Sequence, residues 1–379
     1  MDFELSEEQR LLRDSIDRFV KSEYPFSTRQ EIIFSTLGYS EKNWTLFAEM
    51  GWLALPFDAQ YGGFDGSPVE TAIVMEALGR GLVLEPYLST VVMGGGLLAA
   101  VASHDQKERL IPQIVAGELT LAVAYLEPQS RFDPADVETS AKSTADGFVL
   151  SGHKCVVYQG CTADKIIVSA RTHGADRSRE GISLFILDQD LEGVSRKDYK
   201  TLDGQWASDF FFSDVNLPAS ALLGQKGVAL EAIESTLDLV ISAVCAEAVG
   251  AMAAANDITR DYIRVREQFG VPIGSFQVLQ HRWVDMYMET EMAKSMSDVL
   301  AMRLRDRDED SALMVAATKV RIGKAGLVVG QGATQLHGGV GMTNEYAVGH
   351  YYKRLMTIDI LFGNQDYHCS RYEQLEIVA

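Results

Sequence analysis

The stretch LTLAVAYL, residues 119–126, marks the point where this 379-residue chain changes from helical to β texture. Further segments rich in β-branched and aromatic residues follow it, separated by turn residues such as Ser151-Gly152 and Asp203-Gly204. Runs of this kind, bounded by turn signals, are typical of strands. The sequence therefore predicts an antiparallel β domain from about Leu119 to Gly224, which includes GFVLSG (147–152), DKIIVSART (164–172), GISLFILD (181–188) and DFFFSDVNL (209–217).

Helical patterns flank the β region on both sides. Ser6 and Gln9 have the spacing of a capping box, and apolar residues recur behind them at helical intervals. Residues 43–55 and 70–81 have the pattern of amphipathic helices, and helical periodicity returns from about Lys226. This order favours an α+β fold with segregated layers. We expect an N-terminal helical domain (1–120), a middle antiparallel β domain (121–225) and a C-terminal helical domain (226–379).

Composition and charge exclude several classes of function. The formal net charge is −19, so nucleic acid and acidic membrane surfaces are poor partners for the surface as a whole. The acidic start MDFELSEEQ does not resemble a targeting signal. The stretch YLSTVVMGGGLLAAVAS (87–103) is short and glycine-rich, which favours a buried helix over a membrane span.

Cysteine and histidine are scattered along the chain. Cys155, Cys161, Cys245 and Cys369 show no CxxC spacing, and the seven histidines form no HxxxH or HExxH pattern. Reduced thiols in a cytoplasmic protein are the default for such spacing. The sequence predicts no metal site.

The segment RVREQFG (264–270), followed by Gln277, is the first candidate binding motif. Arg266 offers a planar guanidinium suited to a phosphate, and the ring of Phe269 could stack on a base. The alternative interpretation is a solvated basic end of a helix.

The second candidate motif is QLHGGVGMTNEY (335–346), in which adjacent glycines let backbone N–H groups approach a phosphate. The alternative is an ordinary helix end followed by a glycine turn. A Rossmann-type dinucleotide fingerprint is not a good interpretation, because no strand precedes the motif and no βαβ unit surrounds it.

Glu247 lies in the apolar segment LVISAVCAEAVGAMAAA (239–255), where Ser242 is the only other clearly polar side chain. Burial of its carboxylate costs several kcal/mol, on the order of 2–7, unless the group is paired or protonated. Such residues are candidates for functional sites. The structural alternative is a salt bridge to a neighbouring helix or subunit.

Together these motifs resemble the acyl-CoA dehydrogenase family over nearly the whole chain. The resemblance rests on GWLALPFDAQYGG (51–63), EALGRG (76–81), SDFFFSDVNLPASALLG (208–224), RVREQFGVPIGSFQVLQ (264–280) and QLHGGVGMTNEY (335–346). It implies a C-terminal four-helix domain, bound FAD, an acyl-CoA substrate and electron-transfer flavoprotein as electron acceptor. In the family, the residues that reach the FAD of the neighbouring subunit match Arg266, Phe269, Gln277, Gln335, Gly338 and Gly339.

The resemblance fails at the catalytic base. The family removes the α-proton of the thioester with a carboxylate, often the Glu of an I-Y-E-G-T motif, whose match here is Phe362 in ILFGN (360–364). A second lineage carries its base at the position of Val240. Both usual bases are therefore missing, and Glu247, two turns beyond Val240, is our inferred catalytic residue.

Further departures fall in the segments that hold the flavin ring in the family. Leu126 stands before Glu127-Pro128 in place of a threonine, and Val156 to Gly160 (VVYQG) replaces W-I-T-N-G. The chain keeps the residues that serve a neighbour's FAD and loses those that serve its own. This pattern suggests a heteromeric complex with a paralogous subunit, of the type that degrades steroid side chains or pimeloyl-CoA.

Two other hypotheses stay open. The chain could be a non-catalytic scaffold that stabilises an active partner, in which case Glu247 has no role in turnover. It could also be a flavin monooxygenase or oxidase of the same fold, which needs no base for the α-proton.

Overall fold

The structure is a computed structural model that describes residues 3–378. The chain divides into two compact units, each assembled from segments distant in sequence. Unit 1 contains the chain up to Glu31, Ser67–Val83 and everything from Ile241 onward, and unit 2 contains Ile32–Gly66 and Leu84–Val240. This division cuts across the three predicted domains, whose boundaries stay a prediction.

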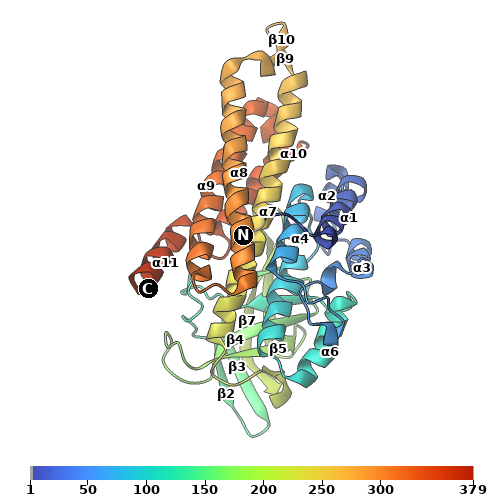
Figure 1. Cartoon of the computed structure of the whole chain (residues 1–379). Coiled ribbons are helices and arrows are strands. Elements are labelled where there is room, and N and C mark those ends of the chain that lie inside the picture. Colours follow the sequence, from blue (N-terminus) through green and yellow to red (C-terminus); the bar gives the residue numbers. More distant parts are fainter. Residues whose placement is uncertain (1–2, 379) are drawn as a thin grey trace. The chain divides into compact units, whose positions relative to one another are not determined.

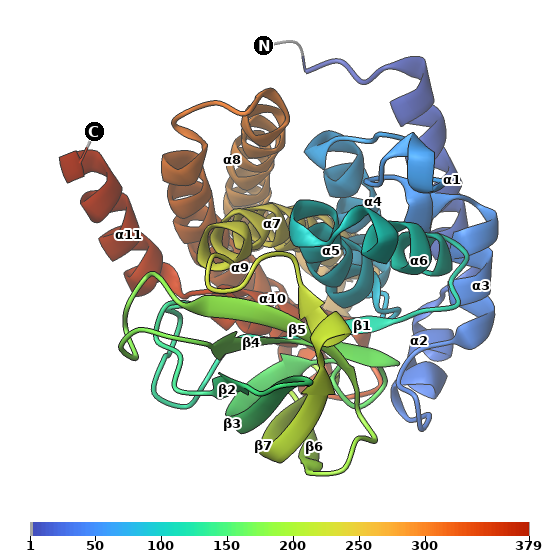
Figure 2. The same cartoon turned by 90° about the horizontal axis from the view of Figure 1, so that it is seen from below.

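Unit 2 is built on one eight-stranded sheet with the order β6-β7-β3-β2-β4-β5-β8, and β1 pairs with β4 beside this path. Figure 2 shows these strands side by side. The strands are β1 (Leu121–Ala124), β2 (Ser140–Ser143), β3 (Gly147–Tyr158), β4 (Lys165–Arg171), β5 (Ile182–Asp188), β6 (Val194–Lys200), β7 (Trp206–Pro218) and β8 (Leu222–Leu223).

The sheet is mixed, which corrects the prediction of a purely antiparallel domain. β1 runs parallel to β4, with Leu121 opposite Lys165, whereas β3 pairs with β7 and β4 with β5 in antiparallel fashion. All four residues of β1 are buried. A strand buried on both faces reads as a continuous apolar run, and such a run carries no signal for its direction.

The helices of unit 2 are short. The predicted helix over 43–55 ends early, because Gly51 adopts a left-handed conformation (φ 74°). The stretch from Tyr87 is a buried helix, as predicted, and its first part has π-helical hydrogen bonding. The elements are α3 (Glu41–Glu49), η1 (Trp52–Ala54), η2 (Ala59–Tyr61), η3 (Tyr87–Gly95), α5 (Gly96–Val101), α6 (His104–Val115) and η4 (Ala219–Ala221).

Unit 1 is helical, and within it α9 packs against α8, α10 and α11. Figure 1 shows a small hairpin, β9–β10, at the end where the long helices α7 and α8 join. The elements of unit 1 are α1 (Glu7–Glu23), α4 (Pro68–Gly81), β9 (Glu267–Gln268), β10 (Val271–Pro272), η5 (Ile273–Ser275), α8 (Gln277–Asp306), α9 (Ser311–His337), η6 (Gly338–Met342), α10 (Ala347–Ile360) and α11 (Gln365–Val378).

Two helices belong to both units, namely α2 (Phe26–Ile33) and α7 (Leu230–Val265). By length and composition α7 could cross a membrane, but 72% of its most apolar window is buried within the protein. Burial of this kind is the pattern of a core helix.

Local signals fix where the helices of unit 1 begin. The Ser6 side chain accepts a hydrogen bond from the backbone N–H of Gln9 at 3.1 Å, and the backbone N–H of Ser6 donates one to the side-chain oxygen of Gln9 at 3.0 Å. This confirms the predicted capping box. α4 uses the same device with Ser67 and Glu70, and Pro68 occupies its first turn, where the missing proline N–H leaves no hydrogen bond unmade.

The backbones of α4 and α7 approach each other closely through two glycines. A Cβ atom added to Gly79 would lie 2.1 Å from the carbonyl oxygen of Glu247, and one added to Gly250 would lie 1.8 Å from that of Glu76. Any side chain at either position would collide with backbone, which cannot rotate away. These glycines therefore set the distance between the two helices.

We predict that Gly250→Ala lowers the stability of the chain by about 2 kcal/mol. Overpacking a tight core contact costs roughly 1–3 kcal/mol or more, and the better helix propensity of alanine returns only about 1 kcal/mol. The measurement is the midpoint of urea unfolding. The matched control is Gly326→Ala on α9, whose Cβ would meet Leu355 at an ordinary 3.4 Å. Equal effects of the two substitutions would contradict this account of the crossing.

Candidate cofactor site and the buried carboxylate

The residues predicted to bind the cofactor lie at one end of the helical bundle of unit 1. α7 ends at Val265, and the chain passes through the β9–β10 hairpin before α8 begins at Gln277. Phe269 sits at the turn of the hairpin in a left-handed conformation (φ 57°), and its side chain is 93% exposed. Its ring contacts the ring of Phe276 edge-on, with the centroids 6.2 Å apart, and the rest of the ring is open to solvent.

The second motif meets the first at this end. The hydroxyl of Tyr262, near the end of α7, donates a hydrogen bond to the carbonyl of His337 at 3.3 Å. The two rings also stack, with their centroids 4.4 Å apart. α9 ends at His337, so the glycines that follow lie beside the end of α7. The structure thus brings together two motifs that are about 70 residues apart in sequence.

The glycine turn leaves its backbone open. Gly338 has a left-handed φ of 64°, which ends α9 as the alternative interpretation expected. A Cβ atom added to Gly338 or Gly339 would meet no atom within 4 Å. The turn is therefore accessible to a ligand.

The polar candidates at this end have unused hydrogen-bonding capacity. Arg266, Gln277 and Gln335 are exposed. Within residues 3–378, their side chains make no hydrogen bond or ion pair. An exposed guanidinium, two amides, an aromatic ring and an open glycine turn suit the phosphates and base of a nucleotide.

Glu247 lies in a different environment, where it forms a buried ion pair with Arg354 of α10. Its two carboxylate oxygens accept hydrogen bonds from Arg354 Nε at 2.6 Å and Nη2 at 2.7 Å. The side chains are only 6% and 4% exposed. A bidentate pair of this geometry holds both oxygens of the carboxylate.

This pairing matches the structural alternative for Glu247, a salt bridge to a neighbouring helix. Protonation would neutralise the carboxylate and so weaken its pairing with the buried guanidinium of Arg354. The role of Glu247 as the base stays a prediction, and its contacts favour a structural role. Phe362 is half-buried in the turn between α10 and α11, with a left-handed φ of 59°.

In unit 2 the structure joins the two segments that depart from the family. The backbone N–H of Cys155 donates to the carbonyl of Leu126 at 2.9 Å. Val156 follows in a left-handed conformation (φ 50°) and is 44% exposed, whereas Tyr158 is buried. The side chains that these segments offer are therefore apolar at 126 and 156.

A buried charge network behind these segments was missed from the sequence. Lys154 is fully buried, and its Nζ donates to Glu127 at 2.7 Å and to Ser169 at 3.0 Å. Burial lowers the pKa of Lys154 to about 8, against the opposing pull of Glu127. Burial alone would raise the pKa of Glu127. The charge of Lys154 and several hydrogen bonds outweigh this effect, so the pKa of Glu127 is lowered. The alternating pattern of β3 could have suggested that Lys154 faces inward.

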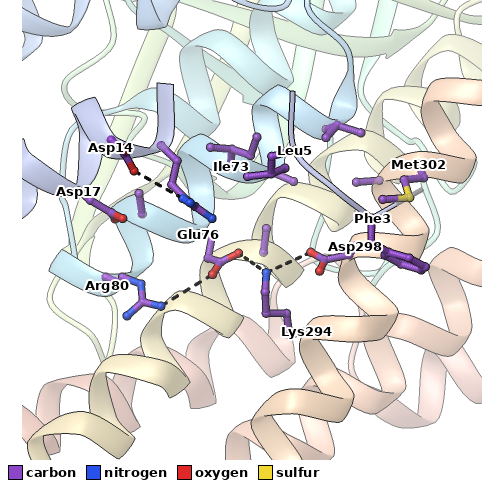
Figure 3. Close-up of a pocket in the computed structure, with 16 residues that line it drawn as sticks. Phe3, Leu5, Asp14, Asp17, Ile73, Glu76, Arg80, Lys294, Asp298 and Met302 are labelled. Carbon is purple, nitrogen blue, oxygen red and sulfur yellow. Dashed lines mark hydrogen bonds and ion pairs between the residues drawn. The ribbon is translucent and has the colours of Figure 1, made fainter. Parts of the chain in front are cut away.

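Unit 1 also contains a cavity of about 470 Å³, and none of the candidate residues lines it. Figure 3 shows the side chains around this cavity. Its polar side is occupied by mutual ion pairs, in which Lys294 contacts Glu76 at 2.9 Å and Asp298 at 3.3 Å. Burial raises the pKa of Asp298. Because Lys294 is already paired with two carboxylates, it is not free to bind a phosphate, and the cavity does not replace the predicted cofactor site.

Among residues 3–378, no group of three His, Cys, Asp or Glu side chains could hold a metal ion. All four cysteines are free thiols.

Comparison with known proteins identifies the family. Family models match residues 6–118 (acyl-CoA dehydrogenase, N-terminal domain), 122–215 (middle domain) and 230–374 (C-terminal domain). The chain belongs to the acyl-CoA dehydrogenase family and has its fold.

Three relatives illustrate the range of this family. A probable acyl-CoA dehydrogenase, YngJ of Bacillus subtilis, is 28% identical over 371 residues, which cover 97% of each chain. The FAD complex of PigA is 25% identical, with a TM-score of 0.91 and full coverage of both chains. The Tcur3481-Tcur3483 steroid acyl-CoA dehydrogenase, as a G363A variant, is 26% identical, with a TM-score of 0.87 and 98% coverage of both.

We predict that Arg354→Met destabilises the chain by about 3–5 kcal/mol, because it leaves the Glu247 carboxylate buried without a partner. The double variant Glu247→Leu/Arg354→Met should lose less, since it buries no lone charge. Both are measured by urea unfolding. A double variant at least as unstable as Arg354→Met would contradict the structural role of the pair.

Proposed function

We propose that this chain is one subunit of an FAD-dependent acyl-CoA dehydrogenase, which desaturates an acyl-CoA thioester between its α and β carbons. The observation that carries the proposal is the exposed end of the bundle, where Arg266, Phe269 and the Gly338-Gly339 turn come together with unused binding capacity. The electron acceptor would be electron-transfer flavoprotein. The free thiols support a cytoplasmic location.

The residues fit one part of FAD better than the other. Arg266 would hold the diphosphate and Phe269 would stack on the adenine, with Gln277, Gln335, Gly338 and Gly339 completing this half of the site. When bound, the flavin supplies the hydride acceptor. Around Leu126 and Val156, by contrast, unit 2 offers apolar side chains where a flavin ring needs polar partners.

A paralogous subunit would complete the site. Support comes from the exposure of the candidate residues and from an apolar strip on α8. Val284, Met288 and Met292 are 44%, 53% and 45% exposed and recur every four residues, so they share one face of the helix. Exposed apolar strips of this kind mark contact surfaces for a partner. A steroid acyl-CoA is the substrate class that the likeness to the Tcur3481-Tcur3483 steroid acyl-CoA dehydrogenase suggests.

A second candidate function is that of a scaffold subunit, which stabilises an active partner but does not itself oxidise the acyl-CoA. Two observations favour it over a catalytic role for this chain. Glu247 is held by Arg354, and Phe362 at the usual base position carries no proton acceptor. In that case the base would come from the partner subunit, and this chain would supply only its half of the cofactor site.

We predict that Arg266→Met weakens FAD binding by the purified complex about 10- to 100-fold. Loss of one charge-assisted hydrogen bond to phosphate costs roughly 1.5–3 kcal/mol. Binding is measured by flavin titration. Arg264→Met is the matched control, since Arg264 is also exposed and lies two residues earlier, in the last turn of α7. Equal effects of the two changes would argue against the assignment of Arg266.

A further inference from the structure

The turn that carries Phe362 is held in an unusual way. α10 ends at Ile360 and α11 begins at Gln365. Between them, Phe362 has a φ of 59° and Gly363 a φ of 109°. A left-handed conformation costs a non-glycine residue roughly 1–2 kcal/mol. Contacts elsewhere must therefore hold the chain in this shape.

Two fully buried side chains supply these contacts. Nζ of Lys319, from α9, donates to the carbonyl oxygens of Asp359 at 2.9 Å and Gly363 at 2.7 Å. Nε2 of His368, from α11, lies 3.0 Å from the carbonyl oxygen of Phe362. Because a carbonyl can only accept, Nε2 carries the hydrogen. Two carbonyl groups of the turn and one in the last turn of α10 are thus fixed by side chains from two other helices.

The turn has little room to relax. A Cβ atom on Gly363 would lie 2.4 Å from the ring of Tyr367, and one on Gly323 of α9 would lie 2.1 Å from Asp359 Oδ1. Asp359 Oδ1 also accepts a hydrogen bond from Gln365 at 3.2 Å. The backbone on both sides of Phe362 is therefore packed as well as hydrogen-bonded.

Stability alone does not explain these side chains. Lys319 has no carboxylate within ion-pairing distance in the described part of the chain. Burial lowers its pKa to about 8, and burial beside Lys319 lowers the pKa of His368 to about 3. Burying an ammonium without a carboxylate is costly. A glycine turn in water would end α10 without that cost.

We propose that Lys319 and His368 are positioning residues, which fix the turn so that the side chain at position 362 is presented to the acyl group. The inference rests on the proposed function, in which position 362 corresponds to the catalytic base of the family. The turn keeps its rigid support although the carboxylate is gone. Phe362 then contributes an apolar wall of the acyl site, and a glutamate there would act as a base.

The test restores a carboxylate and asks whether its action depends on Lys319. In Phe362→Glu, the carboxylate takes an α-proton from octanoyl-CoA and returns a deuteron from D₂O, so the C–H bond is replaced by C–D and no oxidant is consumed. We expect this variant to exchange the α-hydrogen at least about 10²-fold faster than the unmodified chain. Exchange is followed by mass spectrometry of the thioester, in the purified complex.

Adding Lys319→Met should slow this exchange about 10²-fold, because a base displaced by about 1 Å loses that much rate. The matched control is Lys324→Met, five residues further along α9 and exposed, which should leave the exchange unchanged. If the Lys319→Met variant does not fold, Lys319→Gln is used in its place, because glutamine keeps an N–H donor at this position. The Phe362→Glu/Lys319→Gln variant should retain part of the exchange rate of Phe362→Glu.

Two results would overturn the inference. Exchange that is no faster in Phe362→Glu than in the unmodified chain shows that position 362 does not reach the acyl group. Exchange that is equally fast with Lys319→Met shows that the buried lysine does not position it. Binding of octanoyl-CoA and of FAD is measured on the same samples. If neither ligand binds, the proposed function is wrong, and this result is distinct from failure of the present inference.

Discussion

The buried ion pair between Glu247 and Arg354 is the interaction on which the helical unit depends. It ties α7 to α10 in a region where the neighbouring side chains of α7 are alanine, valine and methionine. At the same level of α7, Gly250 and Gly79 of α4 let the two helices approach until backbone meets backbone. α7 is therefore fixed by contacts that tolerate neither an added methyl group nor the loss of one charge.

The position of α7 decides the position of the candidate cofactor residues. Arg266 and Phe269 follow directly from its last turn, and Tyr262 locks that turn to the end of α9 through its hydrogen bond and its stacking on His337. The glycine turn is the continuation of α9. An error in the packing of α7 would thus move both halves of the candidate nucleotide-binding end. The Glu247 carboxylate inside α7 opposes such an error through its ion pair with Arg354.

Part of this could be predicted from the sequence. The capping box at Ser6 follows from local hydrogen-bonding preferences, which the sequence reveals. The end of α4 at Gly81 agrees with the predicted range of 70–81, whereas the helix begins two residues earlier, at Pro68. The partner of Glu247 could not be predicted, since Arg354 lies 107 residues away and both residues occur in helices with no special spacing. The parallel pairing of β1 was also beyond reach, because a fully buried strand shows no alternation that would give its direction.

The candidate site divides along the same line. The sequence predicts the candidate motifs well, because they interrupt the apolar periodicity of the helices on either side. Arg266, Phe269 and the two glycines lie in these interruptions. The contacts of Lys319 and His368 with the turn at Phe362 form only where three helices meet. The sequence of any one of these helices therefore does not predict them. Residues that hold other residues in place are the ones that a linear pattern hides.

The central claim is that this chain contributes one half of a shared FAD site. The measurement that tests it most directly is the visible absorption spectrum of the chain purified without a partner, together with its mass in solution. The account predicts little or no bound flavin, and near-stoichiometric flavin when a paralogous acyl-CoA dehydrogenase subunit is co-expressed. A homo-oligomer that retains one flavin per chain would contradict it, because the segments around Leu126 and Val156 would then hold a flavin ring without help.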